Sequence, residues 1–151
     1  MKTIEINISR DEIDTEISKM TAYTGFKSPS AGNQEEYDRI ATVDEDTALL
    51  DRYWATAGNT LAERLKGFVT VFGLTAGALT LTLEVSGSYD DTMTPSVRGD
   101  LRDYMAAAML RSWFSLTLPA KAEEWEVESG RLLRDISSKL HHRQRPKRQV
   151  V

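Results

Sequence analysis

The stretch "ALTLTLEVS" at residues 78–86 constrains the fold more than any other part of the sequence. Apolar Leu79, Leu81, Leu83 and Val85 alternate with Thr80, Thr82, Glu84 and Ser86. This period of two predicts a strand with one buried and one solvated face. Because a lone strand leaves its backbone groups unpaired, a second strand is required. The predicted partner is "TIEINI", with isoleucines at 4, 6 and 8, and a strand of a neighbouring subunit is the alternative.

Most of the other apolar residues have helical spacing. The clearest helix begins near Thr42 or Asp44, whose side chains are suited to an N-cap, and its three carboxylates at 44–46 favour the positive end of the helix dipole. Its predicted buried stripe consists of Leu50, Trp54, Ala57, Leu61, Leu65 and Phe68. The following stretch, 67–85, predicts a helix end, a turn and the strand, and its glycines and threonines argue against a membrane span.

Three more helices are predicted from their end signals. Ser9 and Glu12 form a capping-box pattern before a short amphipathic helix that fades near Tyr23. Thr94 and Pro95 mark an N-cap and first helical position, and Pro119 ends that helix. A fourth helix spans about 120–142, with glutamates first and basic residues last. This charge order complements the helix dipole.

These elements predict a mainly α (α+β) protein. We expect an antiparallel bundle of about four helices with a small β-hairpin or two-stranded β-element. At 151 residues the chain is predicted to form one domain, 1–142, followed by a basic flexible C-terminal tail, 143–151. The long connection at 24–42 has few apolar residues, and loops of this length are usually functional.

The residues that usually carry catalysis are sparse. The sequence has no cysteine, and its two histidines, His141 and His142, are neighbours near the C-terminus. Adjacent helical residues face different ways, so we predict neither a metal pair nor a catalytic base there. Asp90 and Asp91 favour a solvated turn over paired acids. The three tryptophans favour core packing. We therefore predict no enzyme, no cofactor and no metal, and an intracellular soluble protein.

The charge is unevenly distributed. Residues 1–138 hold 14 Lys and Arg against 23 Asp and Glu, whereas 139–151 hold five basic residues and no acid. These five are the predicted contacts with a partner or DNA: Lys139, Arg143, Arg145, Lys147 and Arg148. The predicted contacts between copies are Phe26, Tyr37, Glu123 and Glu124. A basic tail on an acidic body favours a segment that becomes ordered on an acidic neighbour or on nearby nucleic acid.

Two segments carry a family resemblance. "EDTALLDRYWATAGNTLAERLKGF" and the later "SVRGDLRDYMAAAMLRSWF" resemble the head–tail connector (head-completion, neck adaptor) proteins of tailed bacteriophages. The shared pattern is an acidic start to a long helix and a later Ala-rich helix that ends in an aromatic pair. It covers about residues 42–142, and the strand at 78–86 resembles the β-segment inserted in such connectors.

The resemblance implies a structural virion protein. It implies a homo-oligomeric ring, twelve-fold where bound to a portal, between the portal protein and the tail or neck proteins. DNA would pass through the lumen without sequence-specific binding, with no membrane involved. The implied location is the virion neck, after assembly in the host cytoplasm. Two alternatives remain: a small nucleic-acid-associated regulator that uses the basic tail, and a tail-completion or terminator ring.

Overall fold

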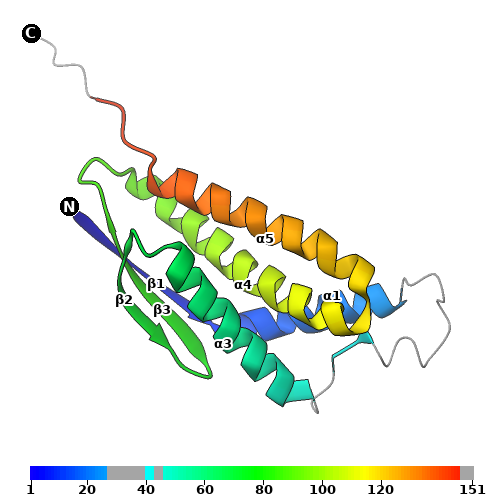
Figure 1. The fold of residues 1–151 in the computed structure, drawn as a ribbon. Coiled ribbons are helices and arrows are strands. Elements are labelled where there is room, and N and C mark those ends of the chain that lie inside the picture. Colours follow the sequence, from blue (N-terminus) through cyan, green and yellow to red (C-terminus); the bar gives the residue numbers. More distant parts are fainter. Residues whose placement is uncertain (27–39, 43–45, 147–151) are drawn as a thin grey trace, which may run out of the picture.

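The computed structural model describes residues 1–26, 40–42 and 46–146 (Figure 1). The described residues form a three-stranded sheet and four α-helices. In chain order the elements are β1 (Lys2–Ser9), α1 (Arg10–Phe26), α3 (Thr47–Arg64), β2 (Val69–Leu74), β3 (Ala78–Val85), a 3-10 turn (Asp91–Met93), α4 (Thr94–Thr117) and α5 (Pro119–Leu140). The predicted class, a mainly helical α+β bundle with a small β-element, is confirmed.

The sheet has the strand order β1-β3-β2, and both pairings are antiparallel. Lys2 lies opposite Val85 and Ser9 opposite Ala78, so the predicted pairing of the 3–8 strand with 78–86 occurs within one chain. The predicted two-stranded element was too small, because β2 adds a third strand. The spacing of Leu65 and Phe68 predicts that the helix continues through 65–68, but α3 ends at Arg64 and a turn follows. The β-branched residues from Val69 onward then form the strand β2.

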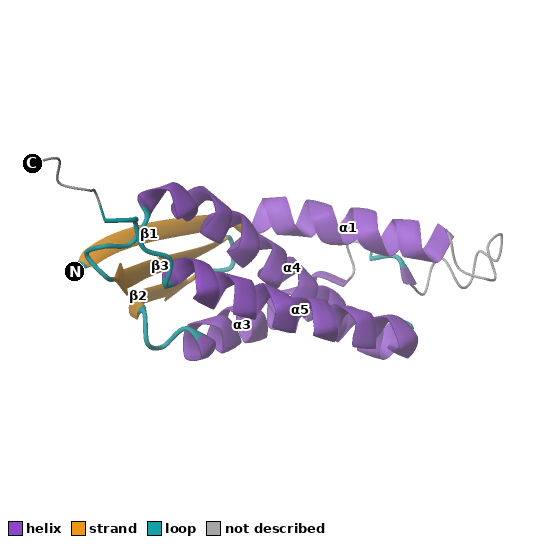
Figure 2. Ribbon diagram, turned by 90° about the horizontal axis from the view of Figure 1, so that it is seen from above, coloured by secondary structure: helices purple, strands orange, loops and turns teal. Residues whose placement is uncertain are grey.

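Helix α4 lies at the centre of the helical layer (Figure 2). It packs against α5, α3 and α1, and also against β1. The stripe that the sequence predicts for this helix is buried, apart from the partly buried Ala108; its residues are Val97, Leu101, Tyr104, Met105, Ala108, Met109 and Trp113. Further α4 side chains are buried as well: Ala106, Ala107, Leu110 and Phe114. A helix that neighbours cover on most sides also buries residues outside a single stripe. The spacing of its apolar residues therefore predicts fewer buried side chains than the structure has.

Two predicted helix starts are wrong. Helix α3 begins at Thr47 with Asp46 at its N-cap, so Thr42 does not cap it, and Asp44 lies outside the described residues. The Thr42 amide instead donates to the Thr21 hydroxyl at 3.2 Å. Helix α4 begins at Thr94, after Met93 as N-cap, because the 3-10 turn leads directly into it.

The other predicted boundaries are closer to the structure. Helix α1 begins directly after Ser9, as predicted, but it continues past Tyr23 to Phe26. Helix α5 begins at Pro119, and the predicted end of α4 near this proline is confirmed. No helix in the described ranges is long and apolar enough to cross a bilayer.

The described molecule is elongated and has two unlike ends (Figures 1 and 2). The sheet end holds the N-terminus, residues 84–90 and the C-terminal end of α5. The helical end holds the C-terminal turn of α1 and the turn between α4 and α5. Helices α1 and α4 run in the same direction, and an ion pair of 3.3 Å joins Glu12 to Arg98 near their starts.

Candidate interaction surfaces

The chain beyond α5 is hydrogen-bonded to the body at the sheet end. The Asp90 amide donates to the His142 carbonyl at 3.1 Å, and the Gln144 amide donates to the Ser88 carbonyl at 2.8 Å. Tyr89 and Arg143 form an antiparallel bridge between these contacts. The predicted start of the tail at residue 143 therefore falls inside a bonded segment, which extends at least to Gln144.

Side chains reinforce this contact. Asp90 accepts from the Thr92 hydroxyl at 2.7 Å and from the Thr92 amide at 3.0 Å, and these bonds are the main reason that its pKa is lowered. His142 Nε2 lies 3.6 Å from Asp90 Oδ2, and Lys2 Nζ lies 3.0 Å from Asp91 Oδ2. Asp90 and Asp91 thus belong to a turn, as predicted, and they link Lys2 of β1 and His142, just after α5, to this turn.

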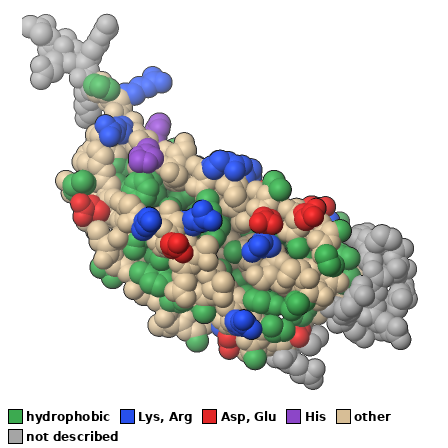
Figure 3. Space-filling view, in the orientation of Figure 1, with side chains coloured by type: hydrophobic (Ala, Val, Ile, Leu, Met, Phe, Trp, Pro, Cys, Tyr) green, Lys and Arg blue, Asp and Glu red, His purple; other side chains and the backbone are tan. Residues whose placement is uncertain are grey.

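The predicted basic contacts differ in their surroundings. Lys139 Nζ binds Asp100 Oδ2 at 2.6 Å and the Ser96 hydroxyl at 2.7 Å, so this side chain joins α5 to α4. Arg143 and Arg145 are exposed beyond the end of α5. Lys147 and Arg148 lie outside the described residues. In the space-filling view, the histidine side chains gather at the end from which the C-terminal segment leaves (Figure 3).

Three of the four predicted contacts between copies, Phe26, Glu123 and Glu124, lie at or near the helical end. The exposed fraction of Phe26 is 66%, and Glu123 and Glu124 are exposed in the first turns of α5. Glu124 pairs with Lys121 at 3.1 Å. Tyr37 lies outside the described residues. Sequence reasoning missed Tyr23, which is 62% exposed. Its position off the Ile13–Ile17 stripe of α1 was the available signal.

Sequence reasoning also missed the buried Arg10. Its guanidinium lies 3.2 Å from Asp14 Oδ2, forms an ion pair with Asp51, and donates to the Ala76 carbonyl at 3.2 Å. The Trp54 ring lies 6.0 Å away, within the range of a cation–π contact. Burial is the main reason that the pKa of Asp14 is raised, and Arg10 lowers it less. Arg10 therefore ties α1, α3 and the β2–β3 turn together.

The tryptophans behave largely as predicted. Trp54 and Trp113 are buried, and their indole N–H groups donate to the carbonyls of Thr75 (2.8 Å) and Ile40 (2.6 Å). Trp125 is partly buried against the same core. Within the described part of the chain, no three His, Asp or Glu side chains are grouped to hold a metal ion.

We compared the chain with known proteins in three ways. Neither the protein-family models nor the curated proteins nor the solved structures gave a match.

Proposed function

We propose that this protein is a structural head–tail connector of a tailed bacteriophage. Copies would form a ring in the virion neck between the portal and the tail, with DNA in the lumen. The observation that carries the proposal is the pair of unlike ends on one elongated body. The helical end exposes Tyr23 and Phe26 and carries Glu123 and Glu124 in the second turn of α5, and the sheet end presents exposed Arg143 and Arg145.

Two unlike ends suit an adaptor, since each can contact a different neighbour. Exposed aromatic side chains are enriched in protein interfaces. Contacts between unlike surfaces of identical copies close into a ring when the rotation between copies allows it. The resemblance of residues 42–142 to phage connectors supports the same reading.

The experiment is light-scattering mass after size exclusion, over a range of protein concentrations. The full-length chain is expected to form a species of several 17.0 kDa copies, or to form one when purified portal is added. The double variant Tyr23→Ser/Phe26→Ser should lower the fraction of this species at least tenfold. Val71→Thr is the matched control, because Val71 is 56% exposed on β2, away from the helical end.

Two results would count against the connector. One is a strict monomer at every concentration that also fails to bind portal. The other is tight DNA binding by the isolated monomer that falls steeply with salt, which the regulator alternative predicts. Only the partner ring that the protein recruits would distinguish a connector from a tail-completion ring.

A further inference from the structure

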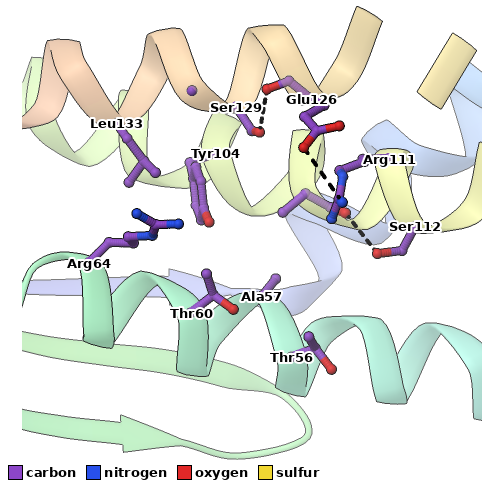
Figure 4. Close-up of a pocket in the computed structure, with 12 residues that line it drawn as sticks. Thr56, Ala57, Thr60, Arg64, Tyr104, Arg111, Ser112, Glu126, Ser129 and Leu133 are labelled. Carbon is purple, nitrogen blue, oxygen red and sulfur yellow. Dashed lines mark hydrogen bonds and ion pairs between the residues drawn. The ribbon is translucent and has the colours of Figure 1, made fainter. Parts of the chain in front are cut away.

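A groove of about 360 Å³ runs between α3, α4 and α5. Thr56, Ala57, Thr60 and Arg64 line it from α3, and Ser129, Gly130 and Leu133 line it from α5 (Figure 4). Tyr104, Ala108, Arg111 and Ser112 of α4 lie between them, and Glu126 lies at the margin. Most of these side chains are small, so α3 and α5 leave space above α4. The volume is at the lower end of the range for ligand sites.

The Tyr104 side chain is the central polar feature of the groove. The residue is only 4% exposed, yet its hydroxyl forms no hydrogen bond within the described residues. Among those residues, no fully buried side-chain oxygen or nitrogen lacks a partner, so this hydroxyl is accessible from the groove. Burial raises the pKa of Tyr104, and the nearby Arg64 and Arg111 lower it less. At neutral pH the phenol is therefore a hydrogen-bond donor without an acceptor.

Positive charge flanks this hydroxyl. Arg64 is exposed and forms no ion pair within the described ranges, and the Thr60 hydroxyl beside it has no hydrogen bond there. Arg111 has one distant pair, 3.7 Å from Glu126. The Ser112 and Ser129 hydroxyls already donate to helix carbonyls. Among the described lining residues, the groups without a partner are thus the Arg64 guanidinium, the Tyr104 phenol and the hydroxyls of Thr60 and Thr56, and the first three are a set of donors that fits a carboxylate.

We propose that this groove binds an acidic segment of a partner protein, with one carboxylate held by Arg64, Tyr104 and Thr60 and a second near Arg111. Tyr104 and Arg111 are seven residues apart on α4, about 10 Å along the helix. A carboxylate at Tyr104 and Arg64 and a second one at Arg111 therefore fit separate side chains of one segment, whereas a free acid with one carboxylate would occupy only one of the two positions.

Nucleic acid fits the groove less well than an acidic peptide. Glu126 leaves the lining with a net charge of only +1, and a duplex carries one phosphate per about 1.7 Å of its axis. Tyr104 is too buried to stack on a base. The inference is independent of the proposed connector function, because none of the residues that line the groove belongs to the interaction surfaces proposed at the two ends.

The test is fluorescence anisotropy of a labelled hexaglutamate peptide titrated with the full-length protein at low salt. Arg64→Gln should weaken binding about tenfold or more, which is typical of a charge-assisted pair. Tyr104→Phe should weaken it about three- to tenfold without lowering the melting temperature, because the hydroxyl forms no hydrogen bond in the part of the chain that the structure describes. Arg52→Gln is the matched control: it removes an exposed arginine from α3 outside the groove, and it should change affinity less than about twofold.

Several outcomes would overturn the proposal. One is that hexaglutamate does not bind at millimolar protein concentrations. Another is that Arg52→Gln weakens binding as much as Arg64→Gln does, and a third is that uncharged hexaglutamine binds as tightly as hexaglutamate. Competition by free glutamate as strong as that of the peptide would indicate a small-acid site instead. Binding of a 20-nucleotide single strand that is tighter than that of the peptide and lost in Arg64→Gln would make the groove a nucleic-acid site.

Discussion

Two arginines, Arg10 and Arg131, each bind two carboxylates, but in very different surroundings. The Arg10 side chain is 8% exposed and contacts residues from three separate parts of the chain. The Arg131 side chain is 50% exposed and pairs with Glu128 and Asp135 of its own helix. Solvent screens the second cluster more strongly than the first, in which the guanidinium is buried and the two carboxylates are partly exposed. An arginine bound to two carboxylates therefore connects separate elements of the fold at Arg10. At Arg131 the same kind of ion pairs lies along the surface of a single helix.

The largest effect is expected for Arg10→Ala. Without the guanidinium, Asp14 and Asp51 repel each other and the Ala76 carbonyl loses its partner. We expect a loss of about 2–3 kcal/mol in the free energy of unfolding, below the range for a fully buried pair because Asp51 is half exposed. Urea unfolding measures it. Arg10→Lys should lower the free energy of unfolding less, because lysine keeps the positive charge but lacks the planar guanidinium that can donate to several acceptors at once. If Arg10→Ala lowered the free energy of unfolding by less than about 1 kcal/mol, the typical limit for a surface ion pair, burial would not distinguish Arg10 from Arg131.

A smaller effect is expected for Arg131→Gln. Its partners are three and four residues away and remain hydrated, so the substitution should lower the urea midpoint only slightly. A double-mutant cycle with Glu128→Gln measures the coupling, and repeating it in 1 M salt should abolish whatever coupling remains. A loss matching that of Arg10→Ala would show that burial is not the deciding factor.

The smallest expected effect is a pair of opposite pH slopes. The pKa of Asp14 is raised in the folded state, chiefly by burial, so protonation favours folding there. Wild type should gain stability relative to Asp14→Asn as pH falls through the raised pKa towards the ordinary carboxyl pKa near 4. The pKa of Glu128 is lowered by its hydrogen bond from Arg131, so wild type should lose stability relative to Glu128→Gln as pH falls through the ordinary pKa to the lowered one.

Urea midpoints of both pairs of proteins between pH 3 and pH 7 would measure these slopes. Slopes of the same sign would contradict the assignment of burial as the main influence at Asp14.

Much of the fold was predictable because its signals are local. The alternation at 79–85 predicts β3 and a partner strand, and it leaves open whether that strand comes from the same chain, as β1 does, or from a neighbouring subunit. The stripe from Leu50 to Leu65 predicted the buried side of α3, and the pairing of Arg131 with Glu128 and Asp135 lies within one turn of a helix. These features depend on residues at most four apart, or on a period that the residue types display directly.

Other features were decided only when distant segments met. In the sequence, nothing distinguishes Arg10 from other polar residues at a helix start. It connects separate elements because Asp51 and the β2–β3 turn pack against it in the folded protein. Strand β2 is short, and its pairing with β3 determines its conformation. The sequence also gave no sign that Gln144 bonds to Ser88, or that Arg64 and Tyr104 share a groove. Periodicity shows which face of an element is buried, because it depends on residues close together in the chain. Which element packs against that face depends on the tertiary arrangement of segments that are far apart in the sequence.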